Sequence, residues 1–174
     1  AHRRMPLVAV DAATGRSRLV TDGAGSADVQ PAWSRDGREI AFARFAGPGH
    51  ASDVVGAAAS GRGAHAVPDA GAQDEQPAWA PDGRRIAFDG LGDDGFRHVY
   101  VVDEAGGPLR AVPGKTGSRE QIPSWSRDGK WIYYGSTRTG RSEIWRAQAD
   151  GGGDLFLRDA HDARSQVHVL DVES

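Results

Sequence analysis

Apolar and polar residues follow one pattern three times along the chain. Each copy has a Pro-x-Trp segment, an Asp-Gly pair and then a segment in which isoleucine and an aromatic residue alternate with other residues. The copies span residues 30–42, 76–88 and 122–134. Their tryptophans, Trp33, Trp79 and Trp125, stand 46 residues apart. A period of about 40–50 residues with strand-like content is typical of the blades of a β-propeller.

Each repeat predicts four short strands. In the clearest unit we expect them at residues 77–79, 85–88, 98–103 and 109–112. Pro81, Asp82 and Gly83 favour a tight turn between the first two, because proline fixes φ, aspartate accepts local backbone donors and glycine adopts a positive φ. A loop is expected over residues 90–97, and a turn at Gly106-Gly107.

The apolar runs predict strands that are buried on both faces, as they must be when each blade packs between two neighbours. We expect one neighbour to contact Ile40, Phe42, Ile86, Phe88, Ile132 and Tyr134. The other should contact Ala41, Ala87 and Tyr133. Together with the three tryptophans, these residues form the predicted core between blades.

The repeat also reaches the N-terminus, because residues 7–20 resemble residues 99–112 at an offset of 92. The predicted units are 1–29 (partial), 30–75, 76–121, 122–165 and 166–174, the last as a partial unit or a closing strand. The segment 167–171 either follows a missing half unit or occupies a first-strand position beside residues 7–10.

The fold predicted for these 174 residues is an all-β propeller of four-stranded antiparallel blades, with about four blades in this chain. An open stack would expose a large apolar blade face, which water disfavours. We therefore expect a small closed ring, a homodimer that completes a ring, or a part of a larger propeller.

Composition excludes several classes of protein. The chain has no cysteine and a formal net charge of −3, so it is neither a disulfide scaffold nor a thiolate zinc protein, and we expect no nucleic-acid partner. No apolar run of about 18 residues is present, so no membrane insertion is expected. The 24 glycines and 9 prolines suit a chain with many short strands and turns.

The motif Gln-Pro-Ala-Trp-Ser-x-Asp-Gly-x-x-Ile-Ala-Phe, with an apolar strand at residues 99–103 and a Gly-Gly turn, resembles the TolB-type propeller repeat. The resemblance covers nearly the whole chain. It implies a propeller fold and a periplasmic or extracellular location. The chain departs from the family pattern at Arg35 and Arg127, where proline is usual, and at Ile122, where glutamine is usual.

Charged residues concentrate on loops that should share one rim of the propeller. Asp74-Glu75 and Asp93-Asp94 are paired carboxylates, whereas the third unit supplies Lys115 and several arginines. Such polarity would steer a charged partner. Glutamines precede the first strands and either reach a ligand at the channel mouth or cap backbone groups. The candidate binding residues are Gln30, Asp74, Glu75, Gln76, Asp93, Asp94, Arg119, Glu120, Gln121, Arg138 and Arg141.

The sequence contains little that indicates catalysis. Neither a Gly-x-Ser-x-Gly elbow nor a phosphate-binding glycine loop occurs, and the six histidines lack the spacing of a metal site. The Asp-Gly pairs have too few oxygen ligands for calcium loops. We expect a non-catalytic module that binds a protein or peptide, without metal or cofactor. The alternatives are a polysaccharide lyase or hydrolase with a metal at the channel mouth, or an accessory or sensor domain of a larger protein.

Overall fold

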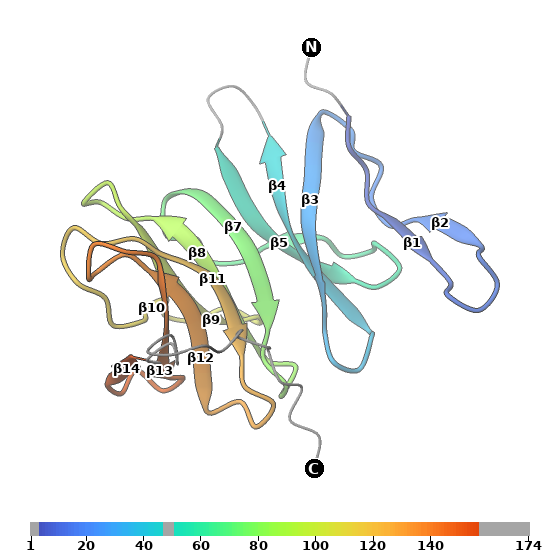
Figure 1. Ribbon diagram of the computed structural model, residues 1–174. Helices are drawn as coiled ribbons and strands as arrows, with labels where there is room; N and C mark the ends of the chain where they lie inside the picture. Colours follow the sequence, from blue (N-terminus) through green and yellow to red (C-terminus); the bar gives the residue numbers. More distant parts are fainter. Residues whose placement is uncertain (1–3, 47–50, 157–174) are drawn as a thin grey trace.

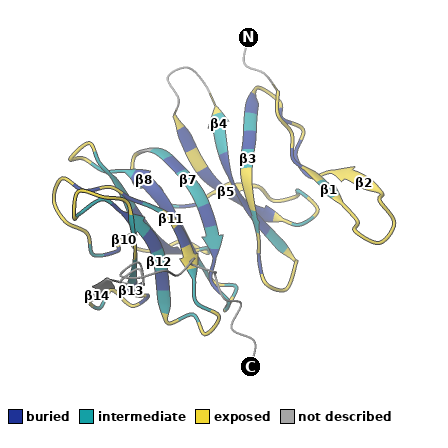
Figure 2. Ribbon diagram, in the orientation of Figure 1, coloured by how far each residue is buried: buried dark blue, intermediate teal, exposed yellow. Residues whose placement is uncertain are grey.

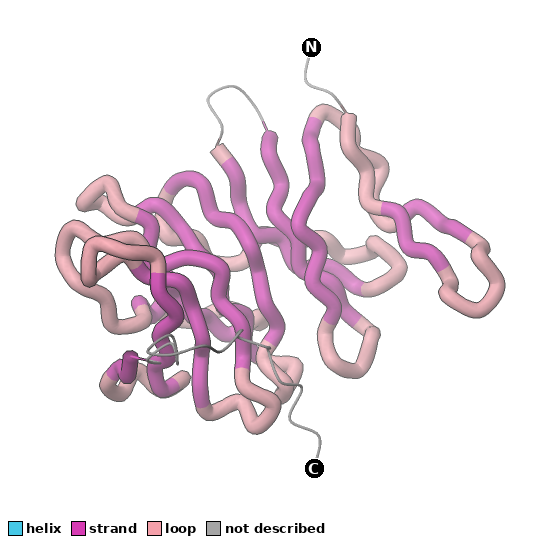
Figure 3. Tube along the Cα trace, in the orientation of Figure 1, coloured by secondary structure: helices cyan, strands magenta, loops and turns pink. Residues whose placement is uncertain are grey.

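The computed structural model describes residues 4–46 and 51–156. These residues form strands joined by turns and loops, and none of them is helical (Figure 3). The strands make three antiparallel sheets of four strands and one sheet of two strands. The predicted fold class, an all-β propeller built from four-stranded antiparallel sheets, is confirmed.

In each four-stranded sheet the strands are paired in chain order. The two-stranded sheet contains β1 (Val8–Val10) and β2 (Ser17–Leu19). The first four-stranded sheet contains β3 (Ser26–Trp33), β4 (Glu39–Ala46), β5 (Ser52–Ala58) and β6 (His65–Ala66). The second contains β7 (Ala72–Trp79), β8 (Arg85–Leu91), β9 (Arg97–Asp103) and β10 (Arg110–Ala111). The third contains β11 (Glu120–Trp125), β12 (Trp131–Ser136), β13 (Glu143–Gln148) and β14 (Asp154–Phe156).

The sheets lie side by side like adjacent blades (Figure 1), and contacts join β3 to β7 and β7 to β11. We call β3, β7 and β11 the inner strands. The two-stranded sheet lies against the first blade, where Leu7 and Val20 pack with Ile40 and Phe42. It corresponds to the second half of a blade. The segment 167–171, predicted as a possible closing strand, lies outside the described residues.

The predicted alternation of core residues is confirmed for the first two blades and for Ile132 and Tyr134 of the third, while no described blade lies beside Tyr133 to test its predicted contact. Ile86 and Phe88 of the second blade are fully buried in one cluster with Ala41 of the first blade. On the opposite face, Ala87 clusters with Ile132 and Tyr134 of the third blade. Figure 2 shows the resulting buried segments in the middle of the blades. The second strands β4 and β8 are therefore buried on both faces, as a propeller requires, whereas β12 is buried on the face toward the second blade.

Trp33 differs from the other two motif tryptophans. It is 45% exposed, whereas Trp79 is 8% exposed and Trp125 is partly buried. Trp125 donates its indole N–H to the carbonyl oxygen of Ala78, on the inner strand of the preceding blade, at 3.0 Å. Among the described residues, no inner strand precedes β3. The prediction that Trp33 belongs to the core between blades is therefore wrong, because the described residues contain no preceding inner strand against which its ring could pack.

The three Asp-Gly turns have the local structure that their sequence predicts. In the second blade, the amide of Gly83 donates to the carbonyl of Ala80 at 3.0 Å, and Asp82 accepts a hydrogen bond from the amide of Arg84 at 2.9 Å. Gly83 has a φ of 68°. That conformation is easy for glycine and strained for residues with a Cβ atom.

Replacing Gly83 with alanine is expected to lower the free energy of unfolding by about 1–2 kcal/mol, because the added Cβ must be held in the left-handed region. Urea unfolding followed by tryptophan fluorescence measures the loss. Gly153→Ala is the matched control, since Gly153 lacks a positive φ and has open space around it. Equal losses in the two variants would contradict the turn assignment.

Candidate functional site

The inner strands share a local distortion just before the proline of each motif. Gln30, Gln76 and Ile122 have φ values of 53°, 54° and 57°. The strand ladder shifts register at the same places. A left-handed residue turns its own N–H out of the ladder, and this conformation costs about 1–3 kcal/mol in a residue other than glycine. The strain therefore recurs with the repeat, and it frees an amide for contacts between blades.

These freed amides join a hydrogen-bonded chain that crosses three blades. The amide of Gln76 donates to Oε1 of Gln30 at 2.9 Å, and Nε2 of Gln30 lies 3.4 Å from Oε2 of Glu75. Glu75 also contacts Arg97 at 3.4 Å. On the third blade, the amide of Ile122 donates to Oδ2 of Asp89 at 3.0 Å. We call Gln30, Glu75, Gln76, Asp89 and Arg97 the inner-strand network.

Asp89 and Arg97 form the centre of this network. Nε of Arg97 donates to Oδ1 of Asp89 at 2.6 Å, and the Asp89 side chain is fully buried while that of Arg97 is 15% exposed. Burial raises the pKa of Asp89, against the opposite effects of the Ile122 amide and the Arg97 guanidinium. Arg97 also donates to the carbonyl of Gln73 at 2.9 Å. The pair thus ties the first and third strands of the second blade to the inner strand of the third.

A second cluster of charged groups lies on the rim formed by the loops between second and third strands and between successive blades. Nδ1 of His98 lies 2.9 Å from Oε2 of Glu120, and its Nε2 lies 2.9 Å from Oδ1 of Asp94. Burial lowers the pKa of His98, but the hydrogen bonds to the two carboxylates outweigh it and raise that pKa. We call Asp94, His98 and Glu120 the rim cluster. It links the β8–β9 loop of the second blade to the third blade.

Glu120 belongs to a repeat of buried carboxylates that the sequence analysis missed. Asp28, Asp74 and Glu120 stand 46 residues apart, and all three are almost completely buried. The guanidinium of Arg44 donates two hydrogen bonds to the carboxylate of Asp28, at 2.8 and 2.9 Å. The Glu120 carboxylate accepts hydrogen bonds from the hydroxyls of two serines. A buried carboxylate needs such partners because burial penalises its charge.

Asp74 has fewer partners than the other two carboxylates. One oxygen accepts a hydrogen bond from the amide of Ala70 at 2.9 Å, and Oδ1 has no hydrogen-bond partner within the described residues. At the position that corresponds to Arg44 of the first blade, the second blade has Gly90, which offers no guanidinium to Asp74. A Cβ atom at residue 90 would lie 2.1 Å from Oδ1 of Asp74. Burial raises the pKa of Asp74 to about 6.

The free energy of unfolding should fall as the pH rises through about 6, because the folded state then has to ionise Asp74. An unfolded aspartate ionises already at a pKa of about 3.9. Asp74→Asn carries no charge, so at pH 7.5 it is expected to be about 3 kcal/mol more stable than the original chain, because the two pKa values differ by about 2. At pH 4 the difference should vanish. Urea unfolding at the two pH values measures both quantities.

Asp93→Asn is the matched control for this prediction, because Asp93 is an exposed residue of the β8–β9 loop. It should show the same pH dependence as the original chain. His98, whose pKa is also raised, adds a slope of the same sign to all three proteins. A stability change in Asp74→Asn that is equal at pH 4 and pH 7.5 would contradict the assignment.

The structure brings some of the predicted site residues together and separates others. Gln30, Glu75 and Gln76 meet in the inner-strand network, and Asp94 meets Glu120 through His98. The side chains of Asp74 and Glu120 are fully buried, and that of Arg138 is 9% exposed. Gln121, on β11, is half-buried. The exposed candidates are Gln30, Asp93, Asp94, Arg119 and Arg141.

The basic rim residues lie on loops that are fastened to each other. The amide of Arg119 donates to Oγ1 of Thr137 at 3.0 Å, and Nζ of Lys115 donates to the carbonyl of Arg138 at 3.3 Å. The Arg138 guanidinium lies over the ring of Trp145, 4.0 Å from its centroid. The β10–β11 and β12–β13 loops are thus held in one arrangement.

Asp89, Arg97 and His98 were not among the predicted site residues. The sequence does contain a signal for Asp89, because a carboxylate interrupts an apolar strand where the other two repeats have Ala43 and Gly135. Arg97 and His98 carry no comparable signal. Their roles depend on the register of β8 with β9, in which Leu91 lies opposite Arg97.

The described part of the chain contains no group of three or more histidine, cysteine, aspartate or glutamate side chains arranged to hold a metal ion. Nor does it contain a helix that could span a membrane.

The chain is similar in fold to several solved bacterial proteins. The putative TolB from Agrobacterium tumefaciens is 24% identical, with a TM-score of 0.78, and the match covers 91% of this chain and 57% of that one. A puromycin-hydrolysing peptidase from Mycobacterium tuberculosis is 18% identical, with a TM-score of 0.71 and coverage of 90% and 28%. An oligogalacturonate lyase from Vibrio parahaemolyticus is 15% identical, with a TM-score of 0.71 and coverage of 88% and 48%.

These similarities show the fold, and the chain spans little more than half of the TolB relative. A comparison with curated proteins finds no match. The sequence model of the TolB beta propeller domain matches residues 3–166, which is most of the chain. The chain therefore belongs to the TolB beta propeller domain family.

Proposed function

We propose that this propeller is a non-catalytic binding module that presents its rim to a protein or peptide partner, in a periplasmic or extracellular compartment. The observation that carries the proposal is the pairing of fixed rim loops with exposed charges of opposite sign. Asp93 and Asp94 stand on the β8–β9 loop, and Arg119 and Arg141 stand on loops of the third blade. Rigid loops bind with a smaller loss of conformational entropy, and charge asymmetry orients a partner.

The rim cluster supports a binding role more than a catalytic one. A general base needs a ring nitrogen that can reach a substrate proton. Both nitrogens of His98 already lie within hydrogen-bond distance of carboxylates. In this arrangement His98 links two blades through both ring nitrogens and holds the β8–β9 loop in place.

The alternative, a lyase or hydrolase, has fewer observations in its favour. It would use the paired carboxylates that the sequence analysis singled out. Asp74 is fully buried, however, and Asp94 is bonded to His98. A role as an accessory or sensor part of a larger protein is compatible with the same rim surface.

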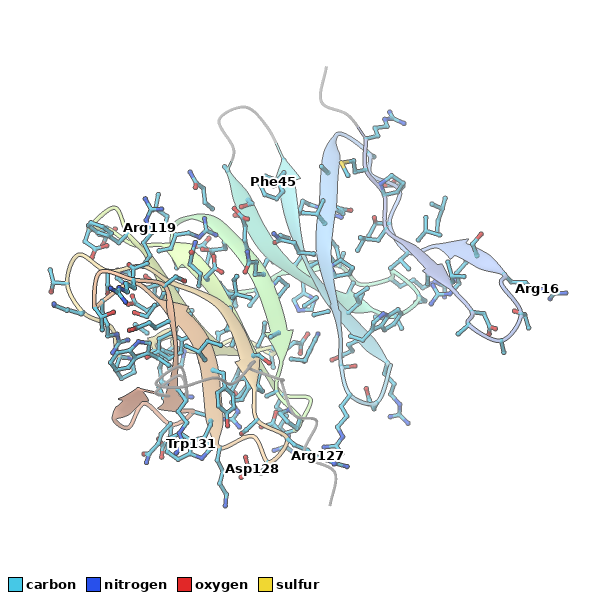
Figure 4. The ribbon with its side chains drawn as sticks, in the orientation of Figure 1. Arg16, Phe45, Arg119, Arg127, Asp128 and Trp131 are labelled. Carbon is cyan, nitrogen blue, oxygen red and sulfur yellow. The ribbon has the colours of Figure 1, made fainter. Side chains whose placement is uncertain are left out.

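Peptide selection followed by calorimetry tests the proposal. Peptides are selected from a random library on the original chain, and their affinities are measured for that chain and for Arg119→Ala/Arg141→Ala. The double variant should bind at least about tenfold more weakly, which corresponds to about 1.4 kcal/mol. Arg16→Ala is the matched control, since Arg16 is an exposed arginine on the β1–β2 loop, far from Arg119 (Figure 4). Failure to select any peptide, or equal affinities for Arg119→Ala/Arg141→Ala and Arg16→Ala, would contradict the proposal that the rim binds the partner.

A further inference from the structure

A cavity of about 420 Å³ opens where the inner strands end, next to the Asp-Gly turns. Its lining includes Trp33, Trp79 and Trp125, the last residues of β3, β7 and β11. Because the strands are antiparallel, this end of the blades is opposite to the rim. Arg127 lines the cavity, and Figure 4 shows it at the lower end of the third blade, away from Arg119 on the rim. The volume lies within the range of about 300–1,000 Å³ that is typical of ligand pockets.

The cavity carries positive charge at equivalent positions of the repeat. Two residues after each tryptophan, the three repeats carry Arg35, Pro81 and Arg127, and all three line the cavity. Both arginines are exposed, and none of the lining residues is acidic. Two guanidinium groups therefore flank one proline across the three blades.

Neither of these arginines forms an ion pair with the aspartate that follows it in the chain. Asp36 accepts a hydrogen bond from the hydroxyl of Ser34 at 2.8 Å, and Asp128 accepts one from Ser126 at 2.6 Å. Each of these carboxylates also receives a backbone amide of its own turn. Within the described ranges, neither Arg35 nor Arg127 has an ion pair or a side-chain hydrogen bond. The structure thus holds two free cations beside aromatic rings.

We propose that this cavity binds an acidic peptide segment. The guanidinium groups of Arg35 and Arg127 pair with its carboxylates, and the exposed ring of Trp33 contacts its apolar side chains. Tryptophan and arginine are the residues that contribute most to binding energy at protein interfaces. Arginine also matches the geometry of a carboxylate. Nucleic acid is the less suitable occupant, because it requires neutralisation of many phosphates and this chain has a net charge of −3. The site is separate from the rim and does not depend on the function proposed for it.

Fluorescence anisotropy with two labelled hexapeptides tests the proposal. One probe contains three glutamates and two leucines, and the other has glutamine in place of each glutamate. The original chain should bind the glutamate peptide at least about tenfold more tightly, and Arg35→Gln/Arg127→Gln should lose that preference. Arg16→Gln/Arg62→Gln, altered at exposed positions on the β1–β2 and β5–β6 loops, is the matched control and should keep it. Because all four arginines are exposed, the variants are expected to fold, which the urea midpoint of each checks.

Equal affinity for the two peptides, or an unchanged preference in Arg35→Gln/Arg127→Gln, would overturn the proposal. Loss of the preference in Arg16→Gln/Arg62→Gln as well would attribute the preference to overall charge and leave the cavity without this role. A third probe, a labelled single-stranded DNA of equal charge, should bind no better than the glutamate peptide. Tighter binding of the DNA would refute the proposed class of ligand.

Discussion

Phe88→Ala is expected to lower the free energy of unfolding by about 3–5 kcal/mol, the usual range for removing a buried phenylalanine. Phe88 has no exposed surface and lies in the cluster that joins the first and second blades. Its ring lies 5.9 Å from that of Tyr100, measured between centroids. The substitution leaves a cavity that rigid neighbouring sheets fill only in part. Urea unfolding at a fixed pH measures the loss.

Phe45→Ala is the matched control for Phe88→Ala. Phe45 lies near the end of β4 and is only partly buried (Figure 4). Folding buries less apolar surface at Phe45 than at Phe88. Phe45→Ala should therefore lower the free energy of unfolding by about 1 kcal/mol or less. A domain of this size is stable by about 5–15 kcal/mol, so the two variants should be well separated. Similar losses in both would mean that the first two blades do not pack through Phe88.

Arg97→Met is expected to lower the free energy of unfolding by about 3–5 kcal/mol, because it leaves the buried carboxylate of Asp89 without its cation. Methionine keeps most of the apolar stem of the arginine, so the loss of stability measures mainly the effect of removing the positive charge. The double variant Arg97→Met/Asp89→Asn should regain at least half of the loss. Asparagine has no charge, and its carbonyl can still accept the amide of Ile122.

The surface pair Arg38–Asp36 supplies the control for this prediction. Its atoms are 3.7 Å apart, and the arginine side chain is 85% exposed. Exposed ion pairs contribute about 0–1 kcal/mol, so Arg38→Met should have little effect. If Arg97→Met and Arg38→Met had equal effects, the inner-strand network would not hold the second and third blades together.

The sequence was sufficient to predict the blades because their packing is encoded locally. The period of 46 and the alternation of Ile86 with Ala87 specify which face of each second strand meets which neighbour, and both are borne out. The Asp-Gly turns likewise depend on residues adjacent in the chain. The exposure of Trp33 escaped prediction because it depends on what precedes β3, not on Trp33 itself.

The inner-strand network could be predicted only in part. Gln30 and Gln76 were identified from their repetition, and the structure joins them by a hydrogen bond between blades. The partnership of Asp89 with Arg97 depends on how two strands are paired across a loop, and a local pattern does not specify this. The buried carboxylates could have been found, since Asp28 and Asp74 repeat with the same spacing as the tryptophans.

The packing of successive blades around the inner strands is tested most directly by hydrogen exchange of the tryptophan indole N–H groups, followed by NMR. The hydrogen bond from Trp125 to Ala78 joins two neighbouring blades, whereas Trp33 is 45% exposed. The indole N–H of Trp125 should therefore exchange at least about tenfold more slowly than that of Trp33, since exchange requires the bond to open. Equal exchange rates at the two positions would contradict the packing of the blades described here.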